Sequence, residues 1–268
     1  MKDIINVYGS WCLVAGAAEG LGEAYSSALA VRGFNVIMVD QKEDSMTALA
    51  DRLESQFGIE TKRLHLDLAQ ASSVSVMMDA VRNTSCRLMI YNAAYSVVQK
   101  FIQNSTEDME AYTDVNVRTP LQLVSAFTKF HMEDNTQQKG IILMSSLASF
   151  WGAGYLAPYG ATKAFNRILA QGLHHELKHD HFDILACVAG ATSTPAYLKT
   201  KPQYGRIRPH VMEPQQVAKE ALRALGRKDI LVTGSSNRRT VFLLSRLLPG
   251  RMSVSLFNKT VRQMFPMQ

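Results

Sequence analysis

Short apolar runs recur along this chain, and segments with the periodicity of helices lie between them. Most of these runs are apolar at every position rather than at every second one, which is typical of strands that are buried on both faces. Such strands, alternating with helices, predict an α/β fold: a single doubly wound domain with a seven-stranded, mostly parallel sheet and helices on both faces. The strands are expected at 11–15, 34–39, 62–66, 88–91, 141–144, 184–188 and 230–232.

No repeat or domain-scale linker interrupts this pattern, so residues 1–234 are expected to form the one domain. A long helix is expected from about residue 105 to 131, with a kink at Pro120, because proline lacks the backbone N–H that a helix interior needs. Segment 195–212 joins the sixth strand to a helix that begins at Pro214, and we expect it to act as a lid.

Charge is distributed unevenly along the chain. The formal net charge is +6, and beyond residue 226 eight lysines and arginines accompany a single acid, Asp229. These basic residues alternate with apolar ones, which predicts a basic amphipathic helical extension over 235–268, packed on the same domain. Its polar face is open to two interpretations: a solvated surface, or weak contact with an anionic membrane or an acidic substrate. Nucleic acid is not expected as a partner, because the chain shows no organised basic face with aromatic platforms.

Three features bear on where the protein works. The cysteines, Cys12, Cys86 and Cys187, are odd in number and far apart, so a disulfide framework is not expected and a reducing compartment fits. Residues 1–16 lack the apolar core and cleavage site of a secretory signal. The uncharged stretch 140–162 has the length of a membrane span, but serines, glycines and a proline interrupt it, so a strand and a loop explain it better. We expect a cytoplasmic protein.

A glycine-rich turn, spaced GxxxGxG, follows the first strand and opens a helix at Gly16, Gly20 and Gly22. Glycines there allow a tight turn and let backbone N–H groups approach a pyrophosphate at the helix N-terminus. Asp40 ends the second strand, where an acid binds the adenosine ribose hydroxyls and repels a 2′-phosphate; a capping role is the alternative. Glu19 adds negative charge to the turn. We therefore expect a Rossmann-type dinucleotide site that prefers NAD, with NADP less favoured.

A phenol and an ammonium lie four residues apart at Tyr159 and Lys163, on one face of an expected helix. Cationic charge favours the phenolate, so the pKa of Tyr159 is expected to be lowered toward the range of a general acid–base. The spacing alone is not specific, since Tyr197 and Lys201 share it. Ser146 distinguishes the first pair, because it ends the fifth strand at the carboxyl edge of the sheet, where open α/β domains bind ligands.

Over roughly residues 8–234 the chain resembles the short-chain dehydrogenase/reductase family, and its end looks like a subgroup of carbonyl reductases with a basic helical extension. Three positions, Ala15, Ala94 and Ala189, depart from the family's pattern, and the methyl group of Ala94 is expected to lower cofactor affinity or shift its loop. The matching motifs, in the family's order, are the turn at 16–22, Asp67-Leu68, Asn92-Ala93-Ala94, Asn116, Ser146, Tyr159 with Lys163, and Gly190 through Thr194.

The resemblance implies roles for four residues in catalysis. Tyr159 would exchange a proton with the substrate oxygen, and Ser146 would hydrogen-bond the same oxygen. Lys163 would bind the nicotinamide ribose, and Asn116 would hold a water that relays protons. The family also implies a homodimer or homotetramer. The cofactor-binding residues expected from the turn and the resemblance together are Gly16, Ala18, Glu19, Gly20, Leu21, Gly22, Asp40, Asp67, Leu68, Asn92, Ala93, Ala94, Tyr159, Lys163, Gly190, Thr192 and Thr194.

Apolar side chains near Ser146 and Tyr159 predict that the substrate is a largely apolar secondary alcohol or ketone. Arg206 and Arg208, in the expected lid, leave room for a carboxylate or a CoA phosphate at the rim of the pocket. The expected walls are Tyr95, Val97, Phe150, Trp151, Tyr155, Tyr197 and Leu198.

Three other interpretations are weighed against an NAD(P)-dependent oxidoreductase. A catalytically weak dinucleotide-sensing or scaffold protein would usually lack the tyrosine or the lysine, and both are present. A lipid-substrate reductase docked on a membrane surface would use the basic extension. A zinc site is suggested by His175-Glu176 and His179, which fit HExxH. These histidines end the helix that begins near Tyr159, several turns from it, and no further ligand motif follows, so no metal is expected.

Overall fold

A seven-stranded sheet forms the centre of the computed structural model, which describes residues 4–134, 136–204 and 209–266. All neighbouring strands are parallel, in the order β3-β2-β1-β4-β5-β6-β7. The strand order therefore reverses between β1 and β4, as it does in doubly wound domains. The strands are β1 (Trp11–Ala15), β2 (Asn35–Asp40), β3 (Thr61–His65), β4 (Leu88–Tyr91), β5 (Lys139–Ser146), β6 (Phe182–Ala189) and β7 (Ile230–Val232).

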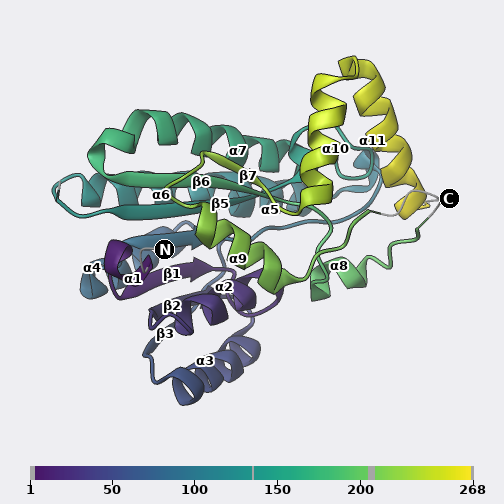
Figure 1. The fold of residues 1–268 in the computed structure, drawn as a ribbon. Coiled ribbons are helices and arrows are strands. Elements are labelled where there is room, and N and C mark those ends of the chain that lie inside the picture. Colours follow the sequence, from purple (N-terminus) through teal and green to yellow (C-terminus); the bar gives the residue numbers. More distant parts are fainter. Residues whose placement is uncertain (1–3, 135, 205–208, 267–268) are drawn as a thin grey trace.

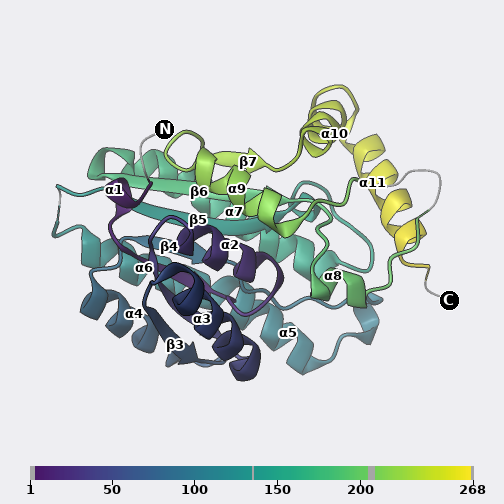
Figure 2. The same cartoon turned by 60° about the horizontal axis from the view of Figure 1, so that its bottom comes forward.

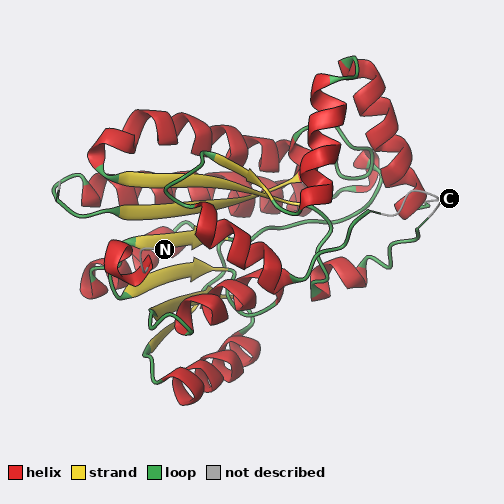
Figure 3. Cartoon of the chain, in the orientation of Figure 1, coloured by secondary structure: helices red, strands yellow, loops and turns green. Residues whose placement is uncertain are grey.

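Helices cover both faces of the sheet (Figure 3). Successive side chains of a strand point to opposite faces, so β1 gives Cys12 and Val14 to one core layer and Leu13 and Ala15 to the other. This two-sided burial explains why the apolar runs are unbroken, and it confirms the predicted fold class. One face carries α1 (Ile4–Tyr8), α2 (Gly20–Ala30), α3 (Glu43–Phe57) and α9 (Pro214–Ala224), and the other carries α4 (Ser73–Thr84), α6 (Thr119–His131) and α7 (Ala157–Leu177).

The long helix expected over 105–131 is divided. Ser105 caps the first part, α5 (Thr106–Thr113), by accepting a hydrogen bond from the backbone N–H of Asp108. A π-helical turn, Asp114–Arg118, then leads into α6. Pro120 lies in the first turn of α6, where a missing N–H is tolerated. The irregularity expected at Pro120 is therefore a π-helical turn that ends just before it, and such turns are frequent at functional sites.

Two further helices, α10 (Ser235–Arg246) and α11 (Gly250–Met264), form a hairpin at the end of the molecule where the strands have their carboxyl ends (Figures 1 and 2). α11 is tied to the loop that precedes α7. Asn258 donates a hydrogen bond to the carbonyl of Gly152 at 2.6 Å and accepts one from the N–H of Gly154 at 2.7 Å. None of the helices in the described ranges is long and apolar enough to cross a membrane.

Candidate active site

A cavity of about 540 Å³ lies at the carboxyl edge of the sheet, over the point where the strand order reverses. Its lining follows the sheet from Asp40, at the end of β2, to Tyr159, beside β5. The predicted cofactor residues that line it are Gly16, Glu19, Gly20, Leu21, Asp40, Asp67, Leu68, Asn92, Ala93, Ala94, Tyr159 and Thr194. Those outside its lining are Ala18, Gly22, Lys163, Gly190 and Thr192. Lining residues that the sequence did not indicate include Gln41, Lys42, Leu66, Ser96, Val115 and Ala196.

The floor of this cavity is the glycine turn packed against the loop after β4. Gly16 has a φ of +78°, and a Cβ there would lie 2.8 Å from the backbone of Ala93. A Cβ on Gly22 would lie 1.7 Å from the carbonyl oxygen of Gly16. Asn92 donates its side-chain N–H to the same oxygen at 2.8 Å. Side chains are thus excluded at positions 16 and 22, which keeps the backbone of the turn close to the cavity.

The carboxylate of Asp40 stabilises the glycine turn by accepting backbone hydrogen bonds. One carboxylate oxygen accepts the backbone N–H of Ala18 at 2.8 Å, and the other accepts that of Lys42 at 3.0 Å. A carboxylate offers about four acceptor positions, so two remain for a ligand's hydroxyl groups. The ammonium of Lys42 lies 2.6 Å from the carboxylate of Glu19. Lys42 was not predicted as a site residue, although its position two residues after the acid that ends β2 places it near the cofactor end of the cavity.

The remaining predicted cofactor residues support the rim. Asp67 accepts the backbone N–H of Ala69 at 2.9 Å. Thr194 caps α8 (Pro195–Lys199), which was expected only as part of a loop, by accepting the N–H of Tyr197 at 3.2 Å. Thr192 is 5% exposed and donates to the carbonyl of Gly190 at 3.1 Å. Thr194 therefore reaches the cavity, while Thr192 and Gly190 lie behind it.

Tyr159 lines the other end of the cavity, and Ser146, which is not part of the lining, lies next to it. Ser146 is the last residue of β5, Tyr159 lies in the first turn of α7, and the Ser146 hydroxyl is close enough to the phenol to lower its pKa, against the larger effect of burial. Gly160 permits this approach, because a Cβ on it would lie 2.9 Å from the carbonyl oxygen of Ala148. A hydroxyl pair beside a dinucleotide-sized cavity can polarise an oxygen atom and exchange a proton with it.

Lys163 is buried beneath this pair. Its ammonium donates to the carbonyl of Met144 at 3.1 Å and lies 5.7 Å from the centre of the Tyr159 ring. Burial lowers the pKa of Lys163 from 10.5 to about 8. The pKa of Tyr159 is raised, because burial of the phenol outweighs the opposite effect of the Ser146 hydroxyl. The lowering of the Tyr159 pKa expected from the sequence is therefore wrong for this structure, in which the ammonium lies over the ring rather than beside the hydroxyl.

Asn116 connects the loop after β4 to α7. It lies in the π-helical turn, accepts the N–H of Tyr95 at 2.7 Å, and donates to the carbonyl of Tyr95 at 2.9 Å and to Thr162 Oγ1 at 3.1 Å. The Thr162 hydroxyl donates in turn to the carbonyl of Tyr159 at 2.9 Å. Asn166 donates to the backbone carbonyl of Asn116 at 3.1 Å. Thr162 and Asn166 were not predicted from the sequence, although they follow Tyr159 by three and seven residues and so lie on the same side of α7 as Tyr159 and Lys163.

A family model described as short chain dehydrogenase matches residues 10–205. The chain belongs to the short-chain dehydrogenase family. It is accordingly an oxidoreductase that acts on CH–OH groups or the corresponding carbonyls, and the predicted family is confirmed.

Several relatives of this short-chain dehydrogenase have been characterised. A 7beta-hydroxysteroid dehydrogenase from Clostridium sardiniense is 28% identical over 231 residues, which cover 86% of this chain and 88% of the relative. A very-long-chain 3-oxoacyl-CoA reductase from Phaeosphaeria nodorum is 28% identical over 226 residues, covering 82% of this chain and 64% of the relative. The solved structure of a 7beta-hydroxysteroid dehydrogenase superposes with a TM-score of 0.86, at 25% identity, over 95% of this chain and 98% of that one. A short-chain dehydrogenase from Sphingobium yanoikuyae in complex with NADPH superposes with a TM-score of 0.76, at 26% identity, over 91% of this chain and 95% of that one.

A second cavity of this short-chain dehydrogenase, about 490 Å³, adjoins the first, because Ser96 and Ala196 line both. Its lining also includes Val97 and Val98 from the loop after β4, Lys199 at the end of α8, Thr200, Lys201 and Gln203 beyond α8, and Met264, Phe265 and Pro266 at the end of α11. The C-terminal extension thus contributes part of the wall beside the candidate site, a role that the sequence did not indicate.

The predicted substrate walls lie partly elsewhere. Tyr95 lines the first cavity and Val97 the second. The other five line neither cavity. The ring centre of Phe150 lies 4.6 Å from the guanidinium of Arg167, the ring centres of Trp151 and Phe257 are 5.2 Å apart, and Tyr155 packs in the apolar cluster of Val261 and Phe265. The hydroxyl of Tyr197 lies 3.0 Å from that of Tyr204, and Leu198 is 59% exposed. Arg206 and Arg208 lie outside the described residues.

The HExxH segment lies at the far end of α7. His175 is in its last turn, and His179 lies in the 3-10 turn that follows, Lys178–Asp180. Within the ranges that the structure describes, no group of three or more histidines, cysteines, aspartates and glutamates is arranged to hold a metal ion.

Proposed function

We propose that this short-chain dehydrogenase interconverts a largely apolar secondary alcohol and its ketone, with NAD(P) as the hydride carrier and Tyr159 as the general acid–base. The observation that carries this proposal is the position of Tyr159, which lines one end of a cavity whose other end is the glycine turn and which has the Ser146 hydroxyl as its neighbour. The residues fit a dinucleotide: N–H groups of the turn lie at one end of α2, and the acid Asp40 ends β2.

The chemistry divides between the cofactor and this chain. A bound nicotinamide accepts or donates the hydride. Tyr159 gives its proton to the ketone oxygen during reduction and removes it from the alcohol during oxidation, while Ser146 donates a hydrogen bond to the same oxygen. The positive charge of Lys163, 5.7 Å from the centre of the Tyr159 ring, would stabilise the phenolate that reduction leaves behind, while burial acts in the opposite direction and raises the pKa of Tyr159. Asn116 keeps Tyr159 in place through Thr162, and we propose that it also orders the water of the proton relay.

We propose NAD as the preferred cofactor. Asp40 and Glu19 line the ribose end of the cavity, and both carboxylates would repel a 2′-phosphate. Lys42 is the opposing feature, since its ammonium would attract that phosphate, but it is engaged by Glu19 at 2.6 Å. NADPH is bound in the related Sphingobium dehydrogenase. The ratio of kcat/KM for NADH to that for NADPH decides between the two, and a ratio below one overturns the preference.

The proposed substrate is a bulky apolar alcohol or ketone, with a steroid, fatty or alicyclic body. Two observations support this class. The second cavity, whose lining includes Val97, Val98, Met264 and Phe265, adjoins the first cavity at Ser96 and Ala196. The relatives include dehydrogenases of 7beta-hydroxysteroids and reductases of very-long-chain 3-oxoacyl-CoA. Comparing a hydroxysteroid with a short alcohol tests the proposal, and equal kcat/KM for the two would contradict it.

The decisive experiment is the Tyr159→Phe variant. It should bind NADH with unchanged affinity, measured by fluorescence titration, because the ring remains in place. Its turnover should fall by at least about 10²–10⁴-fold, which is the usual contribution of a general acid–base. Tyr197→Phe is the matched control, because Tyr197 begins the same Tyr-x-x-x-Lys spacing yet pairs with Tyr204, and it should keep normal turnover. Substantial turnover in Tyr159→Phe would overturn the mechanism.

A second candidate, a reductase that works at a membrane surface, is favoured by the hairpin of α10 and α11. Large apolar side chains are exposed there: Phe242, Leu243, Leu247, Met252, Val254 and Leu256. They are interspersed with arginines and lysines, and no acidic residue follows Asp229, so the hairpin matches an anionic lipid surface. Co-sedimentation with anionic vesicles, lost in Phe242→Ser/Leu247→Ser, would support docking. The alternative is a cytoplasmic homodimer or homotetramer, for which mass photometry with the same variant is the test.

A further inference from the structure

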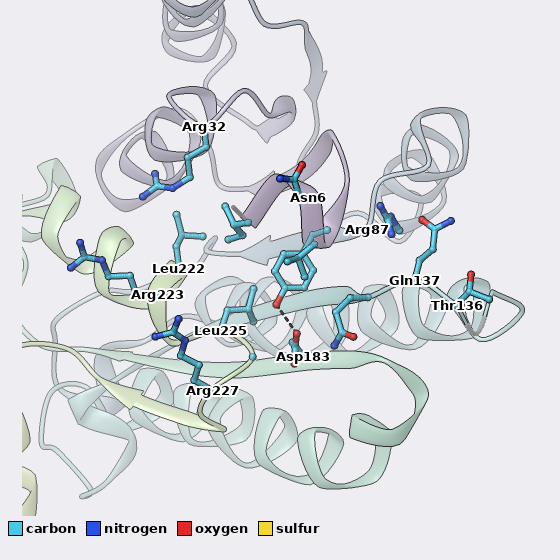
Figure 4. Close-up of a pocket in the computed structure, with 15 residues that line it drawn as sticks. Asn6, Arg32, Arg87, Thr136, Gln137, Asp183, Leu222, Arg223, Leu225 and Arg227 are labelled. Carbon is cyan, nitrogen blue, oxygen red and sulfur yellow. Dashed lines mark hydrogen bonds between the residues drawn. The ribbon is translucent and has the colours of Figure 1, made fainter. Parts of the chain in front are cut away.

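A recess of about 1300 Å³ lies at the amino ends of the strands, on the opposite side of the sheet from the candidate active site (Figure 4). Six parts of the chain meet there: α1, the turn just beyond α2, the residue that precedes β4, the residues that precede β5, the start of β6, and the end of α9 with the loop that follows it. The lining residues are Ile4, Asn6, Val7, Tyr8, Arg32, Arg87, Thr136, Gln137, Gln138, Asp183, Leu222, Arg223, Leu225, Gly226 and Arg227.

The recess carries an excess of positive charge, which is only partly offset by Asp183 in its lining and by Asp134 near Arg87. Four arginines line it, with Asp183 as the accompanying carboxylate, and none of the four has a carboxylate within 4 Å in the described ranges. Asp183 instead accepts the hydroxyl of Tyr8 at 2.6 Å. Elsewhere, arginines with a carboxylate partner are Arg52, Arg63, Arg82, Arg118 and Arg238.

The positions of these arginines argue for a ligand rather than for helix capping alone. Arg32 donates to the carbonyl of Ala28, so it does complete the end of α2. Arg87, however, precedes a strand, and Arg227 lies in the loop beyond α9. Figure 4 shows the side chains of Arg32, Arg223 and Arg227 around one side of the recess and Arg87 on the other. Guanidinium groups spread in this way can contact one polyanion from several directions.

Between the arginines, the recess has an apolar floor. Tyr8, Leu222 and Leu225 line the recess, and each is less than 9% exposed. Small-ligand sites combine such apolar surfaces with a few charged groups that fix orientation. A ligand that matches both features has several negative charges and an apolar or aromatic body.

We propose that this recess is a second ligand site, which binds a phosphorylated organic anion of the nucleoside polyphosphate class. The arginines bind the phosphates, and the floor of Tyr8, Leu222 and Leu225 contacts the organic body. The proposal is independent of the reaction at Tyr159, because the two sites lie at opposite edges of the sheet.

The test measures binding of inorganic triphosphate and of ATP by calorimetry, with the whole protein saturated with dinucleotide so that the cofactor cavity is filled. Arg223→Gln/Arg227→Gln removes two exposed guanidinium groups from the recess. The matched control, Arg239→Gln/Arg246→Gln, makes the same change of charge on α10. We expect the Kd of both ligands to rise about tenfold in the recess variant, the combined effect of two exposed ion pairs, and to stay unchanged in the control.

ATP should bind more tightly than triphosphate, because only ATP carries a body for the apolar floor. Equal affinity for the two ligands would overturn the assignment of an organic body. Equal Kd values in the two variants, or no saturable binding at millimolar concentration, would overturn the site itself. A change of oligomeric mass in the recess variant without any triphosphate binding would likewise overturn it, in favour of a subunit interface. Turnover should remain normal in both variants.

Discussion

Asp40 connects the stability of the glycine turn with the choice of cofactor, and the Asp40→Ala variant separates the two effects. The substitution removes both acceptors of the backbone N–H groups of Ala18 and Lys42. Ala18 is 5% exposed, so its N–H would be left buried without a partner, which costs about 1–3 kcal/mol. The N–H of Lys42 is closer to solvent and loses less. We expect a total of about 2–3 kcal/mol, or a decrease in Tm of roughly 4–5 °C for a chain of this size.

The assay is thermal unfolding, with Asp40→Asn as the control. An asparagine keeps one acceptor oxygen and loses the charge, so it should show about half of the destabilisation of Asp40→Ala. Its kcat/KM should move toward NADPH, because the repulsion of a 2′-phosphate by Asp40 is gone. If Asp40→Ala unfolds within about 1 °C of the natural chain, the carboxylate does not hold the turn. An unchanged cofactor ratio in Asp40→Asn would refute the electrostatic argument.

Three further predictions concern buried groups. Between about pH 8 and 10.5, Lys163 keeps its proton in the unfolded chain and loses it in the folded one, so the free energy of unfolding should rise with pH in that window. Urea midpoints of the natural chain should show this rise, and those of Lys163→Met should not. Burial lowers the pKa of His131 from 6.5 to about 4, so stability should fall by up to about 3 kcal/mol as the pH drops through that range; a drop of equal size in His131→Phe would contradict this. Gly22→Ala should destabilise the fold by about 3 kcal/mol, because the new Cβ meets the carbonyl of Gly16, whereas Gly172→Ala, in open space on α7, should stabilise it by up to about 1 kcal/mol. Equal melting temperatures for the two glycine variants would refute the steric argument.

The sheet was predictable because a strand that is buried on both faces needs apolar residues at consecutive positions. Val36 to Val39 alternate between the two core layers, and all of them are apolar. Strand ends were less predictable: β5 begins at Lys139, whose buried side chain donates to the carbonyl of Asp134, so a charged residue there hides the start of the strand. The short helix α1 was missed as well, because its five residues are too few to show a period.

The candidate site was predictable where a motif fixes the backbone and unpredictable where side chains pair across elements. The glycine turn and Tyr159 line one cavity, and Ser146 lies beside Tyr159, because parallel strands place their carboxyl ends together. The pairing of Lys42 with Glu19 joins two loops, and no local pattern contains it. The direction of the Tyr159 pKa shift also depends on how deeply the phenol is buried, which four-residue spacing does not encode.

The π-helical turn at Asp114–Arg118 has a consequence for engineering and for sequence comparison. Deleting one residue between positions 106 and 115 would let the segment relax into a regular α-helix with every main-chain bond intact. The same deletion would rotate the Asn116 amide by roughly 100° about the axis, away from Tyr95 and Thr162. Homologues one residue shorter here would therefore need a different anchor for the tyrosine, even if their helices aligned without a visible gap.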